Sequence, residues 1–402
     1  MTIEAVLQQI THDEIIRLAS ELVKIPSYSG LPDQEKAVAE YITAYFHSQQ
    51  ISVRSQEVMP GRPNVIAVLP GTGSGPSLML SGHMDTVPPY HMTENPFSGA
   101  IHRNRLHGRG AADMKGALAA MMAAMTAIHR SGIQLTGDLV FAGVVNEEQL
   151  NEGTEYIVRH GPLTDAAIIG EPTELKIAAG HRGLEWIEVI VHGKATHGGT
   201  PTEGINAISK AARLIRRIEE ELVPTFAQNA HSLVGEPLLN FGVIEGGDQP
   251  SSVAGRCRIC IDRRWTPLET FEGIYQELEV LIREMEREDP QFKATVGRFF
   301  RDSKMMLHRP LVTDLQHPVI KSLEQSIRQA GAGQAEIISF PAWTDASLLS
   351  NYAHVTSVVC GPGHLKDAHS ENESISLDQI IKACEVYTRT AILYCGQENG
   401  HD

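Results

Sequence analysis

The stretch LSGHMDTVPPY, residues 80–90, closes an apolar run and presents His83 and Asp85 two positions apart. The run SLMLSG (77–82) lacks polar alternation, which is typical of a strand covered on both faces of its sheet. Polar residues often mark nothing more than the exit from a strand. A sharper hypothesis is that His83 ligates a metal and Asp85 orients it, and this hypothesis requires partners elsewhere in the chain.

Four more segments share this apolar character and alternate with helical patterns. Among the helical patterns, MKGALAAMMAAMTAIHR (114–130) is rich in alanine and methionine. Strands that alternate with helices predict an α/β fold with a mostly parallel sheet and helices on both faces. The four strand segments are NVIAVLP (64–70), DLVFAGVV (138–145), DAAIIG (165–170) and HVTSVVCG (354–361).

The pattern changes after about Glu185, where EWIEVIVHGKATH alternates between apolar and polar residues. A charged helix, two alternating strands and a second charged helix follow. This order is typical of a small α+β (ferredoxin-like) unit with one open sheet face. We therefore predict an inserted dimerisation or lid domain over 182–298, within a catalytic metal-binding domain of 1–181 and 299–402.

Composition narrows the class of partner. The 402 residues include 34 Lys and Arg against 49 Asp and Glu, a formal charge of −15. This balance argues against nucleic acid and anionic membranes and favours a small-molecule substrate. The N-terminus lacks the pattern of a signal peptide and no run is long enough for a membrane span, so we expect a cytoplasmic location.

The five cysteines are scattered along the chain, which favours reduced thiols over a disulfide framework. Cys257 and Cys260 form a C-x-x-C within RCRICIDRR. That segment alternates like a strand, and a spacing of three places the two side chains on opposite faces. A metal or redox function for this pair is therefore disfavoured.

Candidate ligands follow the apolar strands, at the edge where open α/β sheets bind their ligands. Each has a simpler interpretation: Asp113 as a helix N-cap, Glu147 and Glu148 as a solvated turn, Glu171 before Pro172 likewise, and His369 as a surface histidine. Their coincidence at one sheet edge weakens those interpretations. Together they make a plausible set for two zinc ions: His83, Asp113, Glu148, Glu171 and His369.

The chain resembles the di-zinc amidohydrolases that include aminoacylase, acetylornithine deacetylase, succinyl-diaminopimelate desuccinylase and glutamate carboxypeptidase. The motifs that carry the resemblance occur in the order of that family and span nearly the whole chain. They are SGHMDTVP, GRGAADMKG, NEEQLNEGT, IIGEPT, GKATHGGTPTEGINAI and GPGHLKDAHSENESI.

The resemblance implies two metal ions per chain, zinc or, in its place, cobalt or manganese. Asp113 would bridge the two ions, with a cis peptide bond after it. The other ligands would divide into two pairs, His83 with Glu171 and Glu148 with His369.

Glu147 would be the general base, taking a proton from a metal-activated water and passing it to the leaving amine. Asp85 would orient His83. The resemblance also implies that His197, in KATHGGTP, reaches the active site of a neighbouring subunit and stabilises the oxyanion, so that residues 182–298 would form a homodimer. A plain loop histidine is the alternative for His197.

Substrate contacts are predicted at Asn240, Arg263 and Arg264, with a surface ion pair as the alternative for either arginine. Backbone N–H groups at Gly361 and Gly363 are candidates for binding a substrate carboxylate, or the segment is a plain turn. Ser251 stands where family members often have an asparagine near the substrate.

We expect a metal-dependent hydrolase that cleaves an N-acylated amino acid or a short peptide, of the acetylornithine deacetylase type. The segments TDASLL (344–349) and GPG…AH favour that branch. Succinyl-diaminopimelate desuccinylase activity, carboxypeptidase or dipeptidase activity, and a catalytically inert binding homologue are the alternatives.

Overall fold

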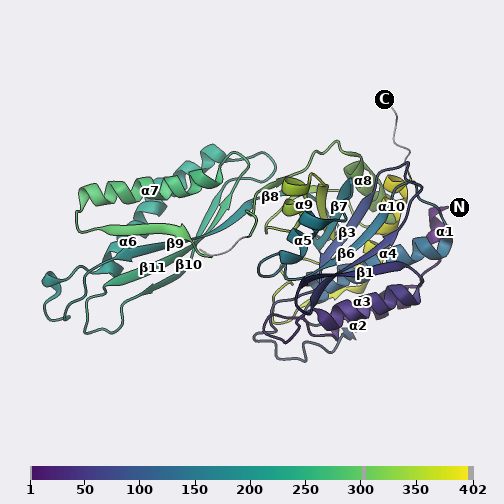
Figure 1. Ribbon diagram of the computed structural model, residues 1–402, viewed down its shortest axis with the longest axis horizontal. Coiled ribbons are helices and arrows are strands. Elements are labelled where there is room, and N and C mark those ends of the chain that lie inside the picture. The colour runs from purple at the N-terminus through teal and green to yellow at the C-terminus, as the bar shows by residue number, and fades with distance from the viewer. Residues whose placement is uncertain (1, 301–304, 397–402) are drawn as a thin grey trace. The chain divides into compact units, whose positions relative to one another are not determined.

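The computed structural model in Figure 1 describes residues 2–300 and 305–396. Unit 1 consists of Met1–Gly180, Thr313–Phe340 and Thr344–Asp402, and unit 2 of His181–Val312 and Pro341–Trp343. Unit 2 thus continues beyond the predicted boundary at residue 298. The reason is that the later segment packs within unit 2: the His308 carbonyl accepts the Leu184 N–H at 2.9 Å, and the His308 ring stacks on Trp343 with centroids 3.9 Å apart.

The central sheet has nine strands within the described residues, in the order β1-β2-β6-β3-β7-β15-β8-β13, with β14 beside β8. Its inner strands β6, β3, β7 and β15 run parallel, whereas β1, β2 and β8 are antiparallel to their neighbours. This arrangement confirms the predicted α/β class with a mostly parallel sheet. The strands are β1 (Ser52–Met59), β2 (Arg62–Leu69), β3 (Leu78–His83), β6 (Leu139–Val144), β7 (Ala166–Pro172), β8 (Ile177–His181), β13 (Leu311–Val312), β14 (Ile337–Phe340) and β15 (Thr356–Gly361).

Helices cover both faces of this sheet, as predicted (Figure 1). One face shares a hydrophobic core with α1 (Ile3–Leu7), α2 (His12–Val23), α3 (Lys36–Ser48), α4 (Gly116–Ser131), α8 (Pro318–Ala330) and α10 (Leu377–Cys395). The other helices, α5 (Glu152–His160) and α9 (Ala346–Ala353), pack on each other, and α9 also contacts β7 and β15.

Helix α4 lies close to the sheet because two strands present glycine to it. A Cβ on Gly82 of β3 would lie 3.0 Å from Leu118 Cδ2, and one on Gly170 of β7 would lie 2.9 Å from Ala117 Cβ. The segment Ala111–Ser131 is the one described helix long and apolar enough to cross a membrane, and its most apolar 18-residue window is fully buried. It is therefore the core helix of unit 1, and its start lies beside the ends of β3 and β7.

Unit 2 has the order β9 (Gly183–His192), α6 (Ala207–Arg217), β10 (Leu238–Gly246), β11 (Arg256–Trp265), α7 (Phe271–Glu288) and β12 (Lys293–Arg298). The last strand extends the pattern expected from the sequence. The sheet order β10-β11-β9-β12, with every pair antiparallel, is that of a ferredoxin-like unit. A third, three-stranded sheet, in unit 1, joins β16 (Ser374–Ser376), β5 (Arg105–His107) and β4 (Ala100–His102).

The two cysteines of the C-x-x-C lie on opposite faces of β11, as predicted. Cys257 belongs to the core between the sheet and helices of unit 2, together with Ile259 and Ile261, whereas Cys260 does not. All five cysteines, each within the described residues, are free thiols.

Two histidines, the buried His181 and the half-buried His308, should make unit 2 sensitive to acid. Burial, helped by nearby Arg264, lowers the pKa of both His181 and His308 to about 4. The unfolded chain takes up protons on these histidines near pH 6.5, but the folded unit does not. The free energy of unfolding of unit 2 is therefore unaffected by them above about pH 6.5 and decreases as the pH falls toward about 4.

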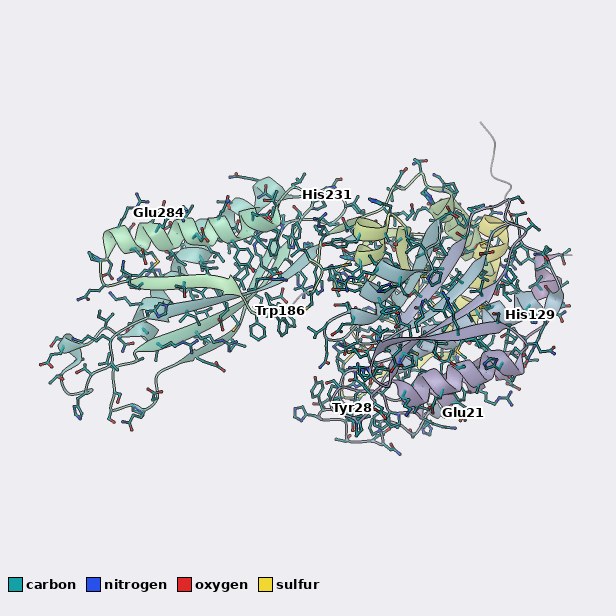
Figure 2. The ribbon with its side chains drawn as sticks, viewed as in Figure 1. Glu21, Tyr28, His129, Trp186, His231 and Glu284 are labelled. Atoms are coloured by element: carbon teal, nitrogen blue, oxygen red, sulfur yellow. The ribbon has the colours of Figure 1, made fainter. Side chains whose placement is uncertain are left out.

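The variant His308→Phe keeps a ring against Trp343 and removes one titrating group, so it should lose roughly half of that acid sensitivity. Tryptophan fluorescence measures unit 2 alone, because Trp186 (Figure 2), Trp265 and Trp343 all belong to it. An acid dependence identical to that of the wild type would contradict this account.

Candidate metal centre

Polar side chains collect at the carboxyl ends of the parallel strands of unit 1. His83 ends β3, Glu147 and Glu148 follow β6, and Glu171 lies near the end of β7. His369 follows β15, and Asp113 lies in the short helical segment Ala111–Lys115 that precedes α4. The peptide bond between Asp113 and Met114 is cis, as expected.

Asp113 lies between the two histidines. Its Oδ1 is 2.9 Å from His83 Nε2 and its Oδ2 is 3.2 Å from His369 Nε2. Each histidine has a second carboxylate beside it: Glu171 Oε1 lies 3.6 Å from His83 Nε2, and Glu148 Oε1 lies 3.2 Å from His369 Nε2. The structure therefore brings all five predicted ligands together, with the carboxylate of Asp113 shared between two pairs.

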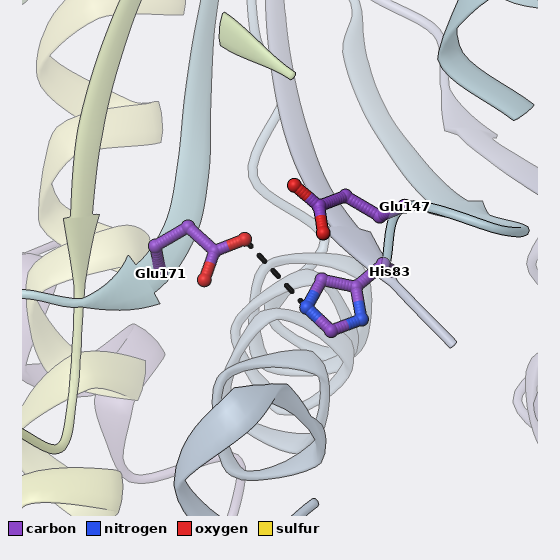
Figure 3. Close-up of side chains that lie close together, drawn as sticks. All are labelled: His83, Glu147 and Glu171. Carbon is purple, nitrogen blue, oxygen red and sulfur yellow. Dashed lines mark ion pairs between the residues drawn. The ribbon is translucent and has the colours of Figure 1, made fainter. Parts of the chain in front are cut away.

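Glu147 lies at the same place, with its carboxylate directed toward His83 and Glu171 (Figure 3). Ligand atoms of these three residues all lie within 4.8 Å of one another. Ligand atoms of His83, Asp113 and Glu148 form a second group, in which all distances are again within 4.8 Å. Glu147 is thus adjacent to the ligand set along the chain and in space.

Asp85 differs from the prediction. The group nearest to His83 Nδ1 is the Asp85 backbone carbonyl, at 2.9 Å, while the carboxylate Oδ1 lies 3.7 Å away. That carboxylate instead accepts the backbone N–H groups of Glu147 and Glu148, one on each oxygen and both at 3.1 Å. Asp85 therefore orients His83 through its main chain and anchors the Glu147–Glu148 turn through its side chain.

A second buried carboxylate, that of Asp345, is linked to the same turn through Asn151. Asn151 Nδ2 donates to the Glu147 carbonyl at 3.1 Å and to Asp345 Oδ1 at 3.0 Å. Asp345 Oδ2 accepts the Thr154 hydroxyl at 2.7 Å. Asp345 belongs to the TDASLL segment, and its connection to the turn runs through Asn151, which lies 194 residues earlier in the chain.

The carboxylates of the centre are crowded and buried, which changes their protonation. Burial raises the pKa of Glu147 and of Glu171 well above the usual range, and neighbouring carboxylates add to the rise. Burial opposes ionisation of Asp113 as well, but hydrogen bonds from His369 and His83 hold its pKa below the usual range. Without a metal, protons must compensate the excess negative charge.

The histidines show why this residue set fits metal ions. Hydrogen bonds to Asp113 and Glu148 raise the pKa of His369 to about 10. The Nδ1–H of His83 donates to the Asp85 carbonyl, which directs Nε2 toward Asp113 and Glu171. A histidine oriented by a carbonyl and facing carboxylates is a common arrangement around a metal, and His nitrogen with carboxylate oxygen suits zinc.

Two predicted arginine contacts are not supported. Arg263 is fully buried, pairs with Glu269 and Glu277, and lies over the Phe226 ring at 4.2 Å, so it stabilises unit 2 and is closed to a substrate. Arg264 forms a two-point ion pair with Asp262, at 2.6 and 2.9 Å, which agrees with the alternative interpretation of an ion pair.

The prediction that the N–H groups of Gly361 and Gly363 bind a substrate carboxylate is wrong, because both groups have partners within the protein. The Gly361 N–H donates to Thr173 Oγ1 at 3.1 Å, and the Gly363 N–H donates to Gln379 Oε1 at 2.6 Å. Both donors are used within the protein, so they are not offered to a substrate carboxylate. A Cβ on Gly361 would lie 2.0 Å from the Gly170 carbonyl oxygen, which explains the glycine by close strand packing.

Asn240 and His197 are exposed residues of unit 2. Asn240 lies on β10, opposite Asp262. His197 lies in the loop after β9, where its Nδ1 accepts the Gly199 N–H at 3.0 Å. The neutral ring therefore carries its proton on Nε2, which leaves that nitrogen as a hydrogen-bond donor.

The sequence signature of Peptidase family M20/M25/M40 matches residues 79–392, which include every residue of the centre. The chain belongs to this family. The resemblance inferred from the motifs is thereby confirmed, and the protein is a hydrolytic enzyme of a metal-dependent family whose centres typically hold two metal ions.

Curated relatives match over nearly the full chain. N-formyl-4-amino-5-aminomethyl-2-methylpyrimidine deformylase of Halalkalibacterium halodurans is 30% identical over 95% of this chain and 93% of its own length. Acetylornithine deacetylase of Vibrio campbellii is 30% identical over 90% and 93%, respectively.

Solved structures show the same fold at lower identity. A tripeptidase from Staphylococcus aureus superposes with a TM-score of 0.79 at 22% identity, over 96% of this chain and 99% of its own. Human carnosine dipeptidase 1 gives a TM-score of 0.78 at 18% identity, over 98% and 99%.

Metal ions should stabilise unit 1, because they replace the protons that otherwise compensate the carboxylates. Adding Zn²⁺ should raise the unfolding temperature measured by calorimetry, and chelation should reverse the rise. At a free Zn²⁺ concentration 1,000 times the dissociation constant, the free energy of unfolding should increase by about 4 kcal/mol. Binding must displace protons from the histidines, including His369 with its pKa of about 10, so affinity should fall as the pH is lowered. His83→Ala is the control: a shift as large as in the wild type would show that zinc binds elsewhere.

Proposed function

We propose that this enzyme hydrolyses the amide bond of a small N-acylated amine or amino acid, in the manner of an acetylornithine deacetylase. The observation that carries the proposal is the shared Asp113, with a histidine and a second carboxylate on each side and Glu147 alongside. We further propose zinc as the metal, held by His83, Asp113, Glu148, Glu171 and His369. Metal ions held there would polarise the amide carbonyl and lower the pKa of the attacking water.

Glu147 is the residue suited to move the proton. The residue is half-buried, and its carboxylate lies beside His83 and Glu171 without being one of the five proposed ligands, so it is available to accept a proton from water in the centre. It takes a proton from the attacking water and delivers it to the amine nitrogen as the amide bond breaks. Asp85 and Asn151 hold its main chain, so the carboxylate needs little reorganisation during the transfer.

Two acyl groups have support from the relatives. The deacetylase and the deformylase are each 30% identical to this chain over at least nine-tenths of its length. Acetyl and formyl groups are both small, so they share the requirement for a tight acyl site. We place deacetylation first and deformylation second, with succinyl substrates and dipeptides as the further alternatives.

The proposal is tested with a panel of N-acetyl, N-formyl and N-succinyl amino acids, the N-formyl aminomethylpyrimidine and dipeptides. We expect release from an acetyl or formyl substrate that is lost on chelation and restored by Zn²⁺. Cleavage of dipeptides alone would replace the proposed substrate class. A metal-loaded protein inert toward the whole panel would contradict the proposal.

Glu147→Gln should retain two metal ions and lose about 10²–10⁴-fold in kcat, because the amide cannot accept the water's proton. The control is Glu174→Gln, an exposed carboxylate just past β7 that should keep the wild-type rate. Metal content by elemental analysis and steady-state rates are the measurements. A wild-type kcat in Glu147→Gln would remove this residue from the mechanism.

We also propose that unit 2 forms a homodimer through β10, one of the two edge strands of its sheet. Leu238, Val243 and Ile244 on this strand are 49%, 40% and 53% exposed. A long edge strand with exposed apolar side chains favours pairing with another strand. The second copy would bring the Nε2 donor of His197 to the oxyanion that forms in its partner.

Mixing two inactive variants, Glu147→Gln and His197→Ala, should restore partial activity, because a mixed dimer contains one site with both residues intact. Adding Ile244→Lys to both chains should abolish the recovery by breaking the edge contact. Light scattering measures the assembly and a rate assay the recovery. Stable mixed dimers without recovery would show that His197 acts within its own subunit or not at all.

A further inference from the structure

A buried ion pair between Arg109 and Glu373 lies next to the centre and has no part in the chemistry described so far. Their side chains are 1% and 0% exposed. Arg109 precedes Asp113 on one segment, and Glu373 follows His369 on another. The pair therefore joins the two segments that carry these ligands.

Glu373 uses both carboxylate oxygens in this connection. Its Oε1 accepts the backbone N–H groups of Ala112 and Asp113 at 3.0 and 3.2 Å, and its Oε2 pairs with Arg109 Nη1. Two further contacts join the same two segments. The Gly108 N–H donates to the Glu373 carbonyl at 3.1 Å, and Arg109 Nη2 lies 3.4 Å from the Ser370 carbonyl oxygen.

The position of the Asp113 main chain decides where its two oxygens lie. Those oxygens face His83 at 2.9 Å and His369 at 3.2 Å, so a small movement of the Asp113 backbone would change both distances together. Glu373 holds that backbone and belongs to the same loop as His369. A single carboxylate thus connects the shared ligand to one of its two histidines.

We propose that Glu373, held by Arg109, is a positioning residue that sets the spacing between Asp113 and His369 and thereby the metal affinity of the centre. The inference rests on the proposed metal-dependent function. Residues that support metal ligands by hydrogen bonds typically change affinity by about 10–100-fold when replaced. A merely structural ion pair would change stability and leave metal affinity as it is.

Unit 2 contains a matched control in the ion pair of Glu269 with Arg263. The Glu269 side chain is only 6% exposed, pairs with an arginine through Oε1 and accepts a backbone N–H, that of Thr266 at 2.8 Å, through Oε2. Its two partners are not metal ligands. Glu269→Gln therefore makes the same chemical change away from the ligands.

The experiment measures Zn²⁺ affinity by competition with a chromogenic chelator, and unfolding of the metal-free protein, for Glu373→Leu, Glu373→Gln and Glu269→Gln. Glu373→Leu should lose about 10–100-fold in zinc affinity. Glu373→Gln should lose less, because its amide oxygen still accepts the two N–H groups. Glu269→Gln should bind zinc like the wild type while its tryptophan fluorescence reports a less stable unit 2.

Wild-type zinc affinity in both Glu373 variants would overturn the inference, as would an equal loss in Glu269→Gln. If Glu373→Leu fails to fold, the isosteric Glu373→Gln decides by the same comparison with Glu269→Gln. A wild-type protein that binds no zinc would overturn the proposed function and this inference with it. A wild type that binds zinc, with unchanged Glu373 variants, would overturn the inference alone.

Discussion

Repulsion among buried carboxylates is the constraint on which the rest of unit 1 depends. Asp113, Glu147, Glu148 and Glu171 approach one another at the end of the parallel strands, where little water screens their charge. The groups around these carboxylates, and around the nearby Asp85 and Glu373, supply positive charge or hydrogen-bond donors. Two main-chain N–H groups bind Asp85, a guanidinium binds Glu373, and the two histidines lie against Asp113. Metal ions, which centres of this family typically hold, would compensate the remaining negative charge.

Much of this arrangement follows from the order of apolar runs along the chain. The predicted strand at 77–82 is β3 (Leu78–His83), and the other inner strands agree as closely, because strands covered on both faces are nearly continuous in apolar residues. Parallel strands place their carboxyl ends at one edge, so the residues after them meet. That is why the five ligands and Glu147 were predictable as a group.

The errors arise where side-chain direction matters more than position along the chain. On β11 the core residues Cys257, Ile259 and Ile261 occupy every second position, and Arg263 continues that series into the core. The position of Arg263 in this alternating series predicts that its side chain is buried, and this prediction is stronger than the one of a substrate contact. Asp85 lies beyond the end of β3, where a two-residue spacing no longer places side chains on one face. Glu373, Arg109 and Asp345 depend on pairings over long sequence separations, which a single sequence does not display.

The anchoring of the Glu147–Glu148 turn has a consequence for how precisely the site must fold. Because one carboxylate, Asp85, holds two consecutive amides, the proton acceptor and a neighbouring ligand share a single short piece of rigid main chain. Their separation is then set by the conformation of two consecutive residues and by the one carboxylate that binds both of their amides. Thermal motion of the scaffold would translate acceptor and ligand together, and the alignment between them would survive it.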